Sequence, residues 1–145
     1  MRMHLSFLLA IALCSLAPAV EKRIKKSDLP PSVLKTAEEQ AKGATVKGYA
    51  KETEDGQTFY EVETVAGGKS RDILIDAGGK LVEVEEQKDL DSIPAAAKAA
   101  LEKSGKVLKV ESVTRGNNVA YEAIVQSKGK KSEVKVDAEG NALAK

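Results

Sequence analysis

The chain contains one pattern of apolar and turn residues twice. The segment YEVETVAGGKSRDILIDAGGK, residues 60–80, recurs at an offset of 61 as YEAIVQSKGKKSEVKVDAEGN, residues 121–141, with few identities but with matching apolar and turn positions. Upstream, Leu29-Pro30 matches Ile93-Pro94 at an offset of 64. Because turns tolerate insertions, we place the three-residue difference at Glu54-Asp55-Gly56 and expect a longer hairpin there. This self-similarity predicts a duplicated unit.

Each copy is predicted to begin with a short helix. Asp28 and Asp91 stand just before Pro residues, where a capping side chain and a helical first turn are expected, and Gly43 and Gly105 mark the ends. Alternating apolar residues downstream predict half-buried strands separated by Gly-rich turns. The positions predicted to face the helix are Tyr60, Val62, Ile73 and Ile75 in the first copy and Tyr121, Ala123, Val134 and Val136 in the second. The predicted fold class is α+β, with two tandem repeats, each a short helix followed by an antiparallel β-meander of three to four strands.

We place repeat 1 at residues 28–89 and repeat 2 at residues 90–145. A unit of about sixty residues buries only about 60% of the surface of its unfolded chain and is marginal alone, so the copies are expected to pack together. The alternative is two separate units on a linker at residues 85–89. The acidic run at residues 83–91 is interpreted as a solvated strand end and linker rather than a cation site. Whether the two sheets are continuous stays open.

Residues 1–19 are predicted to be a secretory signal peptide. A positively charged start is followed by an apolar run at residues 5–16 and by the small residues Ala17-Pro18-Ala19. The run is shorter than the ~20 residues that a membrane-spanning helix needs. Leu13 before Cys14 disfavours a lipoprotein signal, which prefers a small residue there. We therefore expect a periplasmic or secreted protein whose basic N-terminal arm, residues 20–27, is disordered.

Signal cleavage would remove the only Cys and the only His of the chain, Cys14 and His4. The remaining residues then offer no disulfide, thiol nucleophile, His general base or ordinary zinc or copper site. Loss of Arg2 leaves 22 basic and 22 acidic residues, so the net charge gives no reason to expect nucleic acid binding. Asp76 and Asp137 precede Gly by three residues and are interpreted as turn residues rather than calcium ligands. No enzyme, catalytic residue, metal or cofactor is predicted.

Two segments carry a family resemblance. They are DLPPSVLKTAEEQ…TFYEVETVAGGKSRDILIDAGGKLVEV in the first copy and SIPAAAKAALEKSG…VAYEAIVQSKGKKSEVKVDAEGNALA in the second. Both resemble the PepSY and PepSY-like domains of exported bacterial proteins, and the tandem arrangement is similar to that of the β-lactamase-inhibitor proteins. The family includes protease propeptide modules described as inhibitory or chaperoning. The resemblance therefore implies a protein-binding module outside the cytoplasm.

The strand alternation also predicts a candidate binding surface. It directs Phe59, Glu61 and Leu74 away from the helix, where the second copy has Ala120, Glu122 and Lys135. The left-hand alignment adds Tyr49 to this face. We hypothesise a partner-binding patch that consists of Tyr49, Glu54, Asp55, Phe59 and Leu74. The alternative is that the second repeat or the strand at residues 81–84 covers this face.

The sequence thus predicts an exported, non-catalytic protein-binding module. Inhibition of an extracytoplasmic protease or other hydrolase is the most specific form of this prediction, and the expected partner is another extracytoplasmic protein. We expect a monomer without nucleic acid partners and without stable membrane insertion after cleavage. The alternative is an envelope sensor that binds a small molecule or ion, or a structural component.

Overall fold

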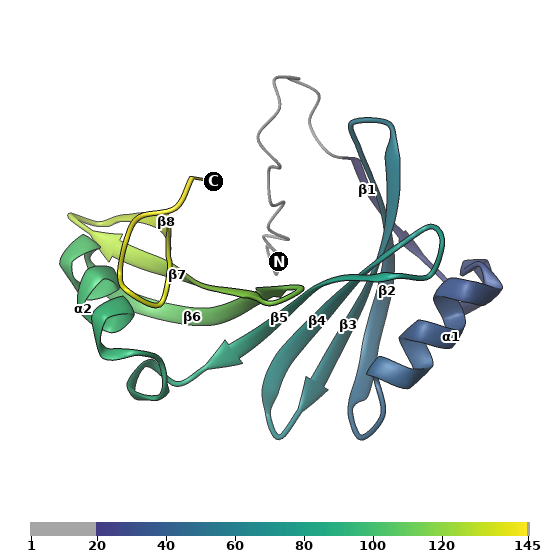
Figure 1. Ribbon diagram of the computed structural model, residues 1–145, viewed down its shortest axis with the longest axis horizontal. Helices are drawn as coiled ribbons and strands as arrows, with labels where there is room; N and C mark the ends of the chain where they lie inside the picture. The colour runs from purple at the N-terminus through teal and green to yellow at the C-terminus, as the bar shows by residue number, and fades with distance from the viewer. Residues whose placement is uncertain (1–19, 145) are drawn as a thin grey trace.

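The computed structural model describes residues 20–144, so the predicted signal peptide lies outside the described residues. The described residues form one antiparallel sheet and two α-helices (Figure 1), which confirms the α+β class. In chain order the elements are β1 (Val20–Ile24), η1 (Lys26–Asp28), α1 (Pro31–Gln40), β2 (Thr45–Glu54), β3 (Gln57–Ala66), β4 (Lys69–Asp76), β5 (Leu81–Lys88), η2 (Leu90–Ser92), α2 (Ala95–Ser104), β6 (Lys106–Arg115), β7 (Asn118–Ser127) and β8 (Lys130–Val136). Among these residues, no helix is long and apolar enough to cross a membrane.

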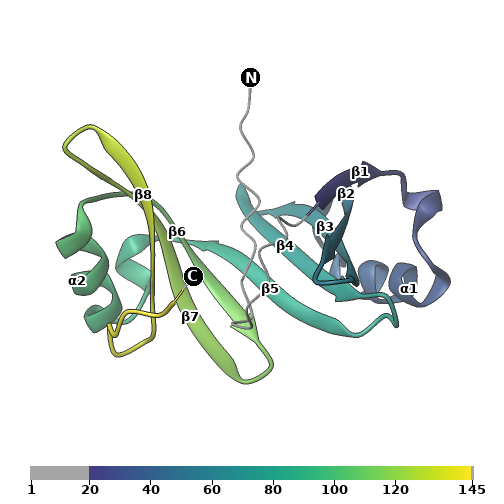
Figure 2. The same cartoon turned by 90° about the horizontal axis from the view of Figure 1, so that it is seen from above.

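The sheet has eight strands in sequence order, and each strand pairs with its neighbours along the chain. Figures 1 and 2 show α1 and α2 at opposite ends of the molecule with β5 and β6 between them. Residues 84–88 of β5 pair with residues 110–114 of β6. The two sheets are therefore continuous. The alternative of two separate units, and the interpretation of the acidic run as a solvated linker, are wrong, because this run forms a central strand.

The prediction of a disordered arm at residues 20–27 is also wrong. Val20–Ile24 forms β1, which pairs with residues 49–53 of β2, and a 3-10 turn follows at Lys26–Asp28. Ile24 packs against the first apolar cluster, but the basic residues around it did not indicate a strand in the sequence. The chain thus gains an edge strand before the first helix.

Two apolar clusters hold the helices against the sheet. In the first, Val33 and Ala37 of α1 are buried against Val62, Ile73 and Ile75. The second cluster contains Ile93, Ala97, Leu101, Val110, Ala123, Val125 and Val136. Full burial of an aliphatic side chain such as Val or Ile contributes about 1.5–3 kcal/mol. These contacts confirm the helix-facing positions that the alternation predicted.

Each helix begins against a turn that requires glycine. Gly79 and Gly140 have φ of +89° and +84°, and an added Cβ would lie 2.7 Å from the Ser32 carbonyl oxygen or 2.6 Å from the Ala96 carbonyl oxygen. Asp76 accepts hydrogen bonds from the backbone N–H groups of Gly78 and Lys80, which confirms its role as a turn residue. The predicted helix cap is wrong, because Pro30 is the N-cap residue and makes no side-chain cap.

Candidate functional site: the open face of the sheet

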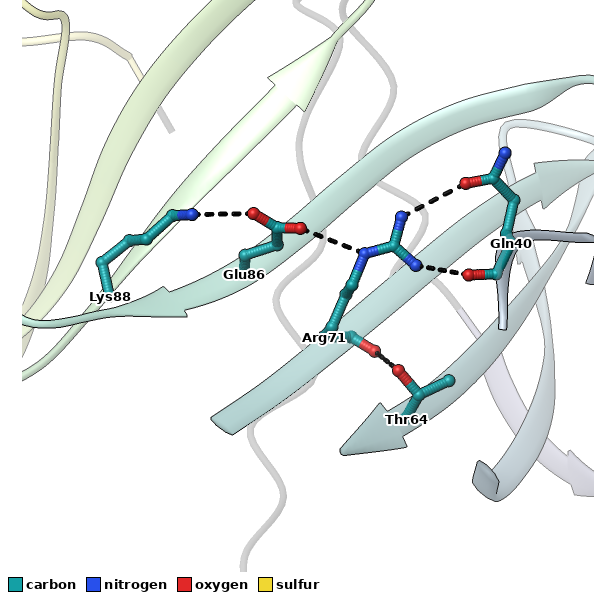
Figure 3. A network of polar contacts seen from close by, with 5 residues as sticks. All are labelled: Gln40, Thr64, Arg71, Glu86 and Lys88. Atoms are coloured by element: carbon teal, nitrogen blue, oxygen red, sulfur yellow. Dashed lines mark hydrogen bonds and ion pairs between the residues drawn. The ribbon is translucent and has the colours of Figure 1, made fainter. Parts of the chain in front are cut away.

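Both helices pack on the same face of the sheet. The Arg71 guanidinium donates to the carbonyl and side-chain oxygens of Gln40, at the end of α1, and to Glu86 on β5 at 3.1 Å (Figure 3). Glu86 therefore lies on the face that α1 covers. It pairs with Ser112, whose next partner across the sheet, Tyr121, packs in the cluster of α2. The helix face is thus continuous from α1 to α2.

We call the opposite side of the sheet the open face, since neither helix packs on it. Its side chains follow from the strand register and from the alternation along each strand. They include Ala50, Glu52, Phe59, Glu61, Glu63, Asp72, Leu74, Glu83, Glu85, Gln87, Glu111, Val113, Arg115, Ala120, Glu122, Ile124, Glu133 and Lys135. This is the surface on which the hypothesised patch was placed.

Phe59 and Leu74 lie on the open face as the alternation predicted. They come from the neighbouring strands β3 and β4, both are half-buried, and neither belongs to the apolar cluster under α1. Leu74 pairs with Glu61, and Phe59 pairs with Glu52 of β2. The apolar side chains are therefore interspersed with acidic ones, in a contact surface of mixed character.

The placement of Tyr49 on this face is wrong. Tyr49 pairs with Val62 and packs against the apolar cluster under α1, because it corresponds to Val110 at the strand offset of 61 and not to Val113 at an offset of 64. The offset of 64 that was used to place Tyr49 holds for the helices but not for the strands that follow them. Helix α2 follows α1 at an offset of 64, but β6 follows β2 at an offset of 61.

The three additional residues of the first half therefore lie between α1 and β2, at residues 41–44, where the second half has Gly105 alone. The β2–β3 hairpin is not longer, because two residues connect the strands here and two connect β6 to β7. Glu54 ends β2 and pairs with Gln57, and Asp55 is an exposed turn residue with φ of +48°. Both lie at the tip of the hairpin.

Carboxyl groups crowd the open face around Phe59 and Leu74. Glu52 and Glu83 are only 6% and 4% exposed. Burial raises the pKa of Glu52 to about 7, and the negative charge of Glu21 acts in the same direction. Burial and the charge of Glu52 raise the pKa of Glu61 to about 8. These side chains therefore retain protons at a pH where ordinary carboxyl groups have lost them.

Carboxyl groups on β4, β5 and β7 also have raised pKa values. Burial, together with the charge of Glu111, raises the pKa of Asp72 to about 6. The pKa of Glu85 is raised further, by burial and then by Glu83. Burial also raises the pKa of Glu122, although Lys135 opposes the shift. Carboxyl groups with raised pKa values thus lie on the open face of both halves of the molecule.

Basic side chains neutralise only part of this crowd. Arg115 pairs with Glu83 at 2.5 Å, and Lys109 pairs with Glu111 at 2.5 Å. Further ion pairs are Arg23–Glu63 at 2.7 Å and Lys135–Glu122 at 3.5 Å. Within residues 20–144, no ion pair reaches Glu52, Glu61, Asp72 or Glu85. Those four side chains have no ion-pair partner among residues 20–144, and of the basic groups only the charge of Lys109 acts on Asp72.

One group of carboxylates could contact a metal ion. Oxygen atoms of Glu21, Glu61 and Glu63 lie within 4.8 Å of one another. Calcium takes six to eight oxygen ligands, and Glu63 already accepts a hydrogen bond from Arg23 at 2.7 Å. These three carboxylates alone would therefore leave most of the ligand positions of a calcium ion unfilled.

Sequence reasoning missed the carboxyl crowd because the acids were interpreted as a solvated surface. Alternation on β3 and β5 does place Glu61 with Glu63, and Glu83 with Glu85, on one face. The missing information was that β5 lies inside one continuous sheet, which brings the acids of seven strands, β2 to β8, onto a common surface.

Comparisons with known proteins agree with this architecture. Residues 32–85 match the family described as Peptidase propeptide and YPEB domain, PepSY. A search of curated proteins finds no match. Among solved structures, a predicted periplasmic protein from Bacteroides eggerthii superposes with a TM-score of 0.65 at 20% identity, covering 79% of this chain and 86% of its own.

Two further structures show the same fold. A DUF2874 family protein from Bacteroides ovatus has a TM-score of 0.63 at 18% identity, covering 79% of this chain and 84% of its own. A BLIP-like protein from Bacteroides fragilis has a TM-score of 0.59 at 20% identity, covering 80% and 85%. The resemblance to PepSY is thus confirmed for residues 32–85, within a chain whose fold is similar to that of BLIP-like and DUF2874 family proteins.

Proposed function

We propose that this chain is an exported, non-catalytic module that binds another extracytoplasmic protein through the open face of its sheet. The observation that carries the proposal is the open face itself. Neither helix covers it, and half-buried Phe59 and Leu74 stand on it between acidic side chains. Mixed apolar and charged surfaces of this kind are typical of protein contacts.

The comparisons support a binding role. The family that residues 32–85 match is named for peptidase propeptides, and one structure of the same fold is described as BLIP-like. Inhibition of an extracytoplasmic protease or other hydrolase is the most specific form of the proposal. The described residues support the lack of catalysis, because residues 20–144 contain neither Cys nor His.

Two further features belong to the proposal. Residues 1–19 serve as the signal peptide. This role agrees with the description of the Bacteroides eggerthii structure as a predicted periplasmic protein. The two halves, residues 28–89 and 90–145, derive from a duplication, since α1 precedes β2–β5 and α2 precedes β6–β8. Duplication supplies two similar surfaces that can diverge.

The test is affinity capture from an envelope extract with residues 20–145 as bait. A second bait carries Phe59→Ser and Leu74→Ser. A protein that binds the first bait and not the second is the expected result, and its enzymatic activity is then assayed with and without the module. The matched control is Val119→Ser, because Val119 is 43% exposed and lies off the open face.

Circular dichroism and thermal melting of all three baits show whether they are folded. Equal capture by the two folded baits would place the binding surface elsewhere. Capture of no protein by the first bait, with no inhibited hydrolase in the compartment, would contradict the proposal.

The acidic crowd favours one second candidate, an envelope sensor that binds a cation at Glu21, Glu61 and Glu63. Calorimetric titration with Ca²⁺ and Mg²⁺ tests it. A saturable signal that disappears in Glu61→Gln would support the sensor, and a flat titration would remove it.

A further inference from the structure

Three pairs of carboxyl groups on the open face lie within hydrogen-bonding reach of each other. Glu52 of β2 meets Glu61 of β3, and Glu83 meets Glu85 two residues along β5. The third pair is Glu122 with Glu133, on β7 and β8. An ionised carboxylate only accepts hydrogen bonds, so a bond between two carboxyl groups requires a proton on one of them. The open face is therefore a surface that holds protons.

The surroundings of the first pair explain why it holds a proton. Glu21 on β1, Asp72 on β4 and neighbouring Glu63 all add negative charge at Glu61. The nearest basic group, Arg23 on β1, is engaged by Glu63. Moreover, Oε2 of Glu61 is shielded from solvent and has no hydrogen-bond partner. A cation that donated hydrogen bonds here would satisfy this oxygen.

The second pair has a similar environment. Asp72 on β4 and Val113 on β6 are the register neighbours of Glu85, and the charges of Glu111 and Glu122 also act on it. Arg115 is engaged by Glu83, and Lys109 by Glu111. Burial and these charges raise the pKa of Glu85, which keeps its proton at neutral pH.

We propose that the open face docks a Lys- or Arg-bearing segment of a protein partner, and that docking releases the protons which its carboxyl pairs hold. This inference rests on the proposed function and names the chemistry of the partner. For each proton released, the O–H bond of a carboxylic acid breaks and the proton passes to solvent. The resulting carboxylate then accepts an N–H hydrogen bond from the incoming Lys or Arg side chain. Association is therefore tighter at higher pH.

A peptide segment fits this surface better than a single ion. The carboxyl groups are distributed from β2 to β8, whereas one ion would contact one cluster. Phe59, Leu74 and Ile124 lie between them and can contact the methylene stems of Lys and Arg. Residues 20–145 carry equal numbers of acidic and basic residues, so the attraction is a property of this face and not of the whole chain.

The test is isothermal titration calorimetry with a hexa-arginine peptide, in buffers that differ in ionisation enthalpy. We expect saturable binding with proton release, and an affinity that rises between pH 6 and pH 8, the range set by Asp72, Glu52 and Glu61. Each proton released raises the affinity up to about tenfold per pH unit. The double variant Glu52→Gln, Glu61→Gln should release fewer protons and bind more weakly.

The control variant is Glu39→Gln, an exposed position on α1, and the control ligand is hexa-glutamate. Carbon-13 NMR titration of the side-chain carboxyl groups in the unchanged protein provides a measurement that needs no variant. Ordinary titration of Glu52, Glu61 and Glu85 there would overturn the inference.

Binding without proton release would also overturn it, as would equal binding by Glu39→Gln and the double variant. A proton-releasing titration with Ca²⁺ alone would overturn it in favour of an ion site. An envelope protein that binds through Phe59 and Leu74, while hexa-arginine does not bind, would refute the cationic partner and leave the proposed function standing.

Discussion

The two halves of the sheet have similar backbones but different charge balance on the open face. Glu61 and Glu122 stand at the same offset of 61 that relates the strands, and so do Leu74 and Lys135. Glu61 pairs across the sheet with Leu74, whereas Glu122 pairs with Lys135. The residue at this one position, Leu74 or Lys135, therefore decides whether the glutamate opposite it has a counter-ion. The comparison teaches that a common frame can hold carboxyl pairs in both halves, with a lysine counter-ion beside the pair in the second half and none beside Glu52 and Glu61 in the first.

The largest expected effect compares the two apolar clusters. Ile73→Ala should lower the free energy of unfolding by about 4 kcal/mol, because Ile73 is fully buried under α1 and its loss leaves a cavity. Val134→Ala, at the matching half-buried position, should lower it by about 1.5 kcal/mol. Urea denaturation measures both. Equal losses would mean that the two clusters are packed alike.

The second largest effect is expected from removing Lys135, the counter-ion of Glu122 in the second half. Lys135→Met keeps the side-chain stem but leaves Glu122 without its ion pair, which should destabilise the protein by about 3 kcal/mol at pH 8. At pH 5 the loss should be smaller, because the pKa of Glu122 is already raised and the acid can take up a proton. Denaturation at both pH values checks this. A loss that does not depend on pH would indicate packing rather than charge.

A smaller effect comes from giving the first half the lysine of the second. In the folded protein the pKa of Glu61 is about 8, above its ordinary value of 4.5. Stability from this group is therefore fully present below about pH 4.5 and is lost as the pH rises through 8.

Leu74→Lys should lower the pKa of Glu61 and reduce the stability difference between pH 5 and pH 8 by about 1–2 kcal/mol. Thermal melts across this range measure it, with Leu74→Met as the uncharged control. An unchanged pH profile would show that Glu61 does not govern this loss.

The smallest effect concerns exposed ion pairs on the helix side. Lys26 pairs with Glu38 in the first half, and Lys98 pairs with Asp91 in the second. Solvent screens such pairs, so Lys26→Met and Lys98→Met should each leave the melting temperature unchanged within error. A clear drop in either variant would show that one helix depends on its ion pair.

The sequence predicted the parts of the fold that depend on short-range periodicity. Alternation placed Val62, Ile73 and Val136 under the helices because side-chain direction repeats every two residues. The placement of Tyr49 failed because the alignment carried the helix offset of 64 into strands that are related by an offset of 61. Sequence reasoning also failed for β1, whose basic residues resembled a solvated tail.

For the candidate site, the face could be predicted from the sequence but its chemistry could not. Phe59 and Leu74 were placed correctly because each lies in a regular strand. The proton-holding pairs depend on which residues meet across strands and along β5 within a single sheet, and on burial of acids that looked exposed. Those facts arise from register and from the β5–β6 pairing, which a single sequence does not encode locally.

The strand order also has a consequence for folding. Since every strand pairs with its neighbour along the chain, most ladders close short hairpin loops and can form early. Only the β1–β2 and β5–β6 ladders must close across a helix, which makes their loop-closure entropy larger. The β5–β6 ladder is therefore the natural place for sub-global opening, and amide exchange there should report how strongly the two halves cooperate.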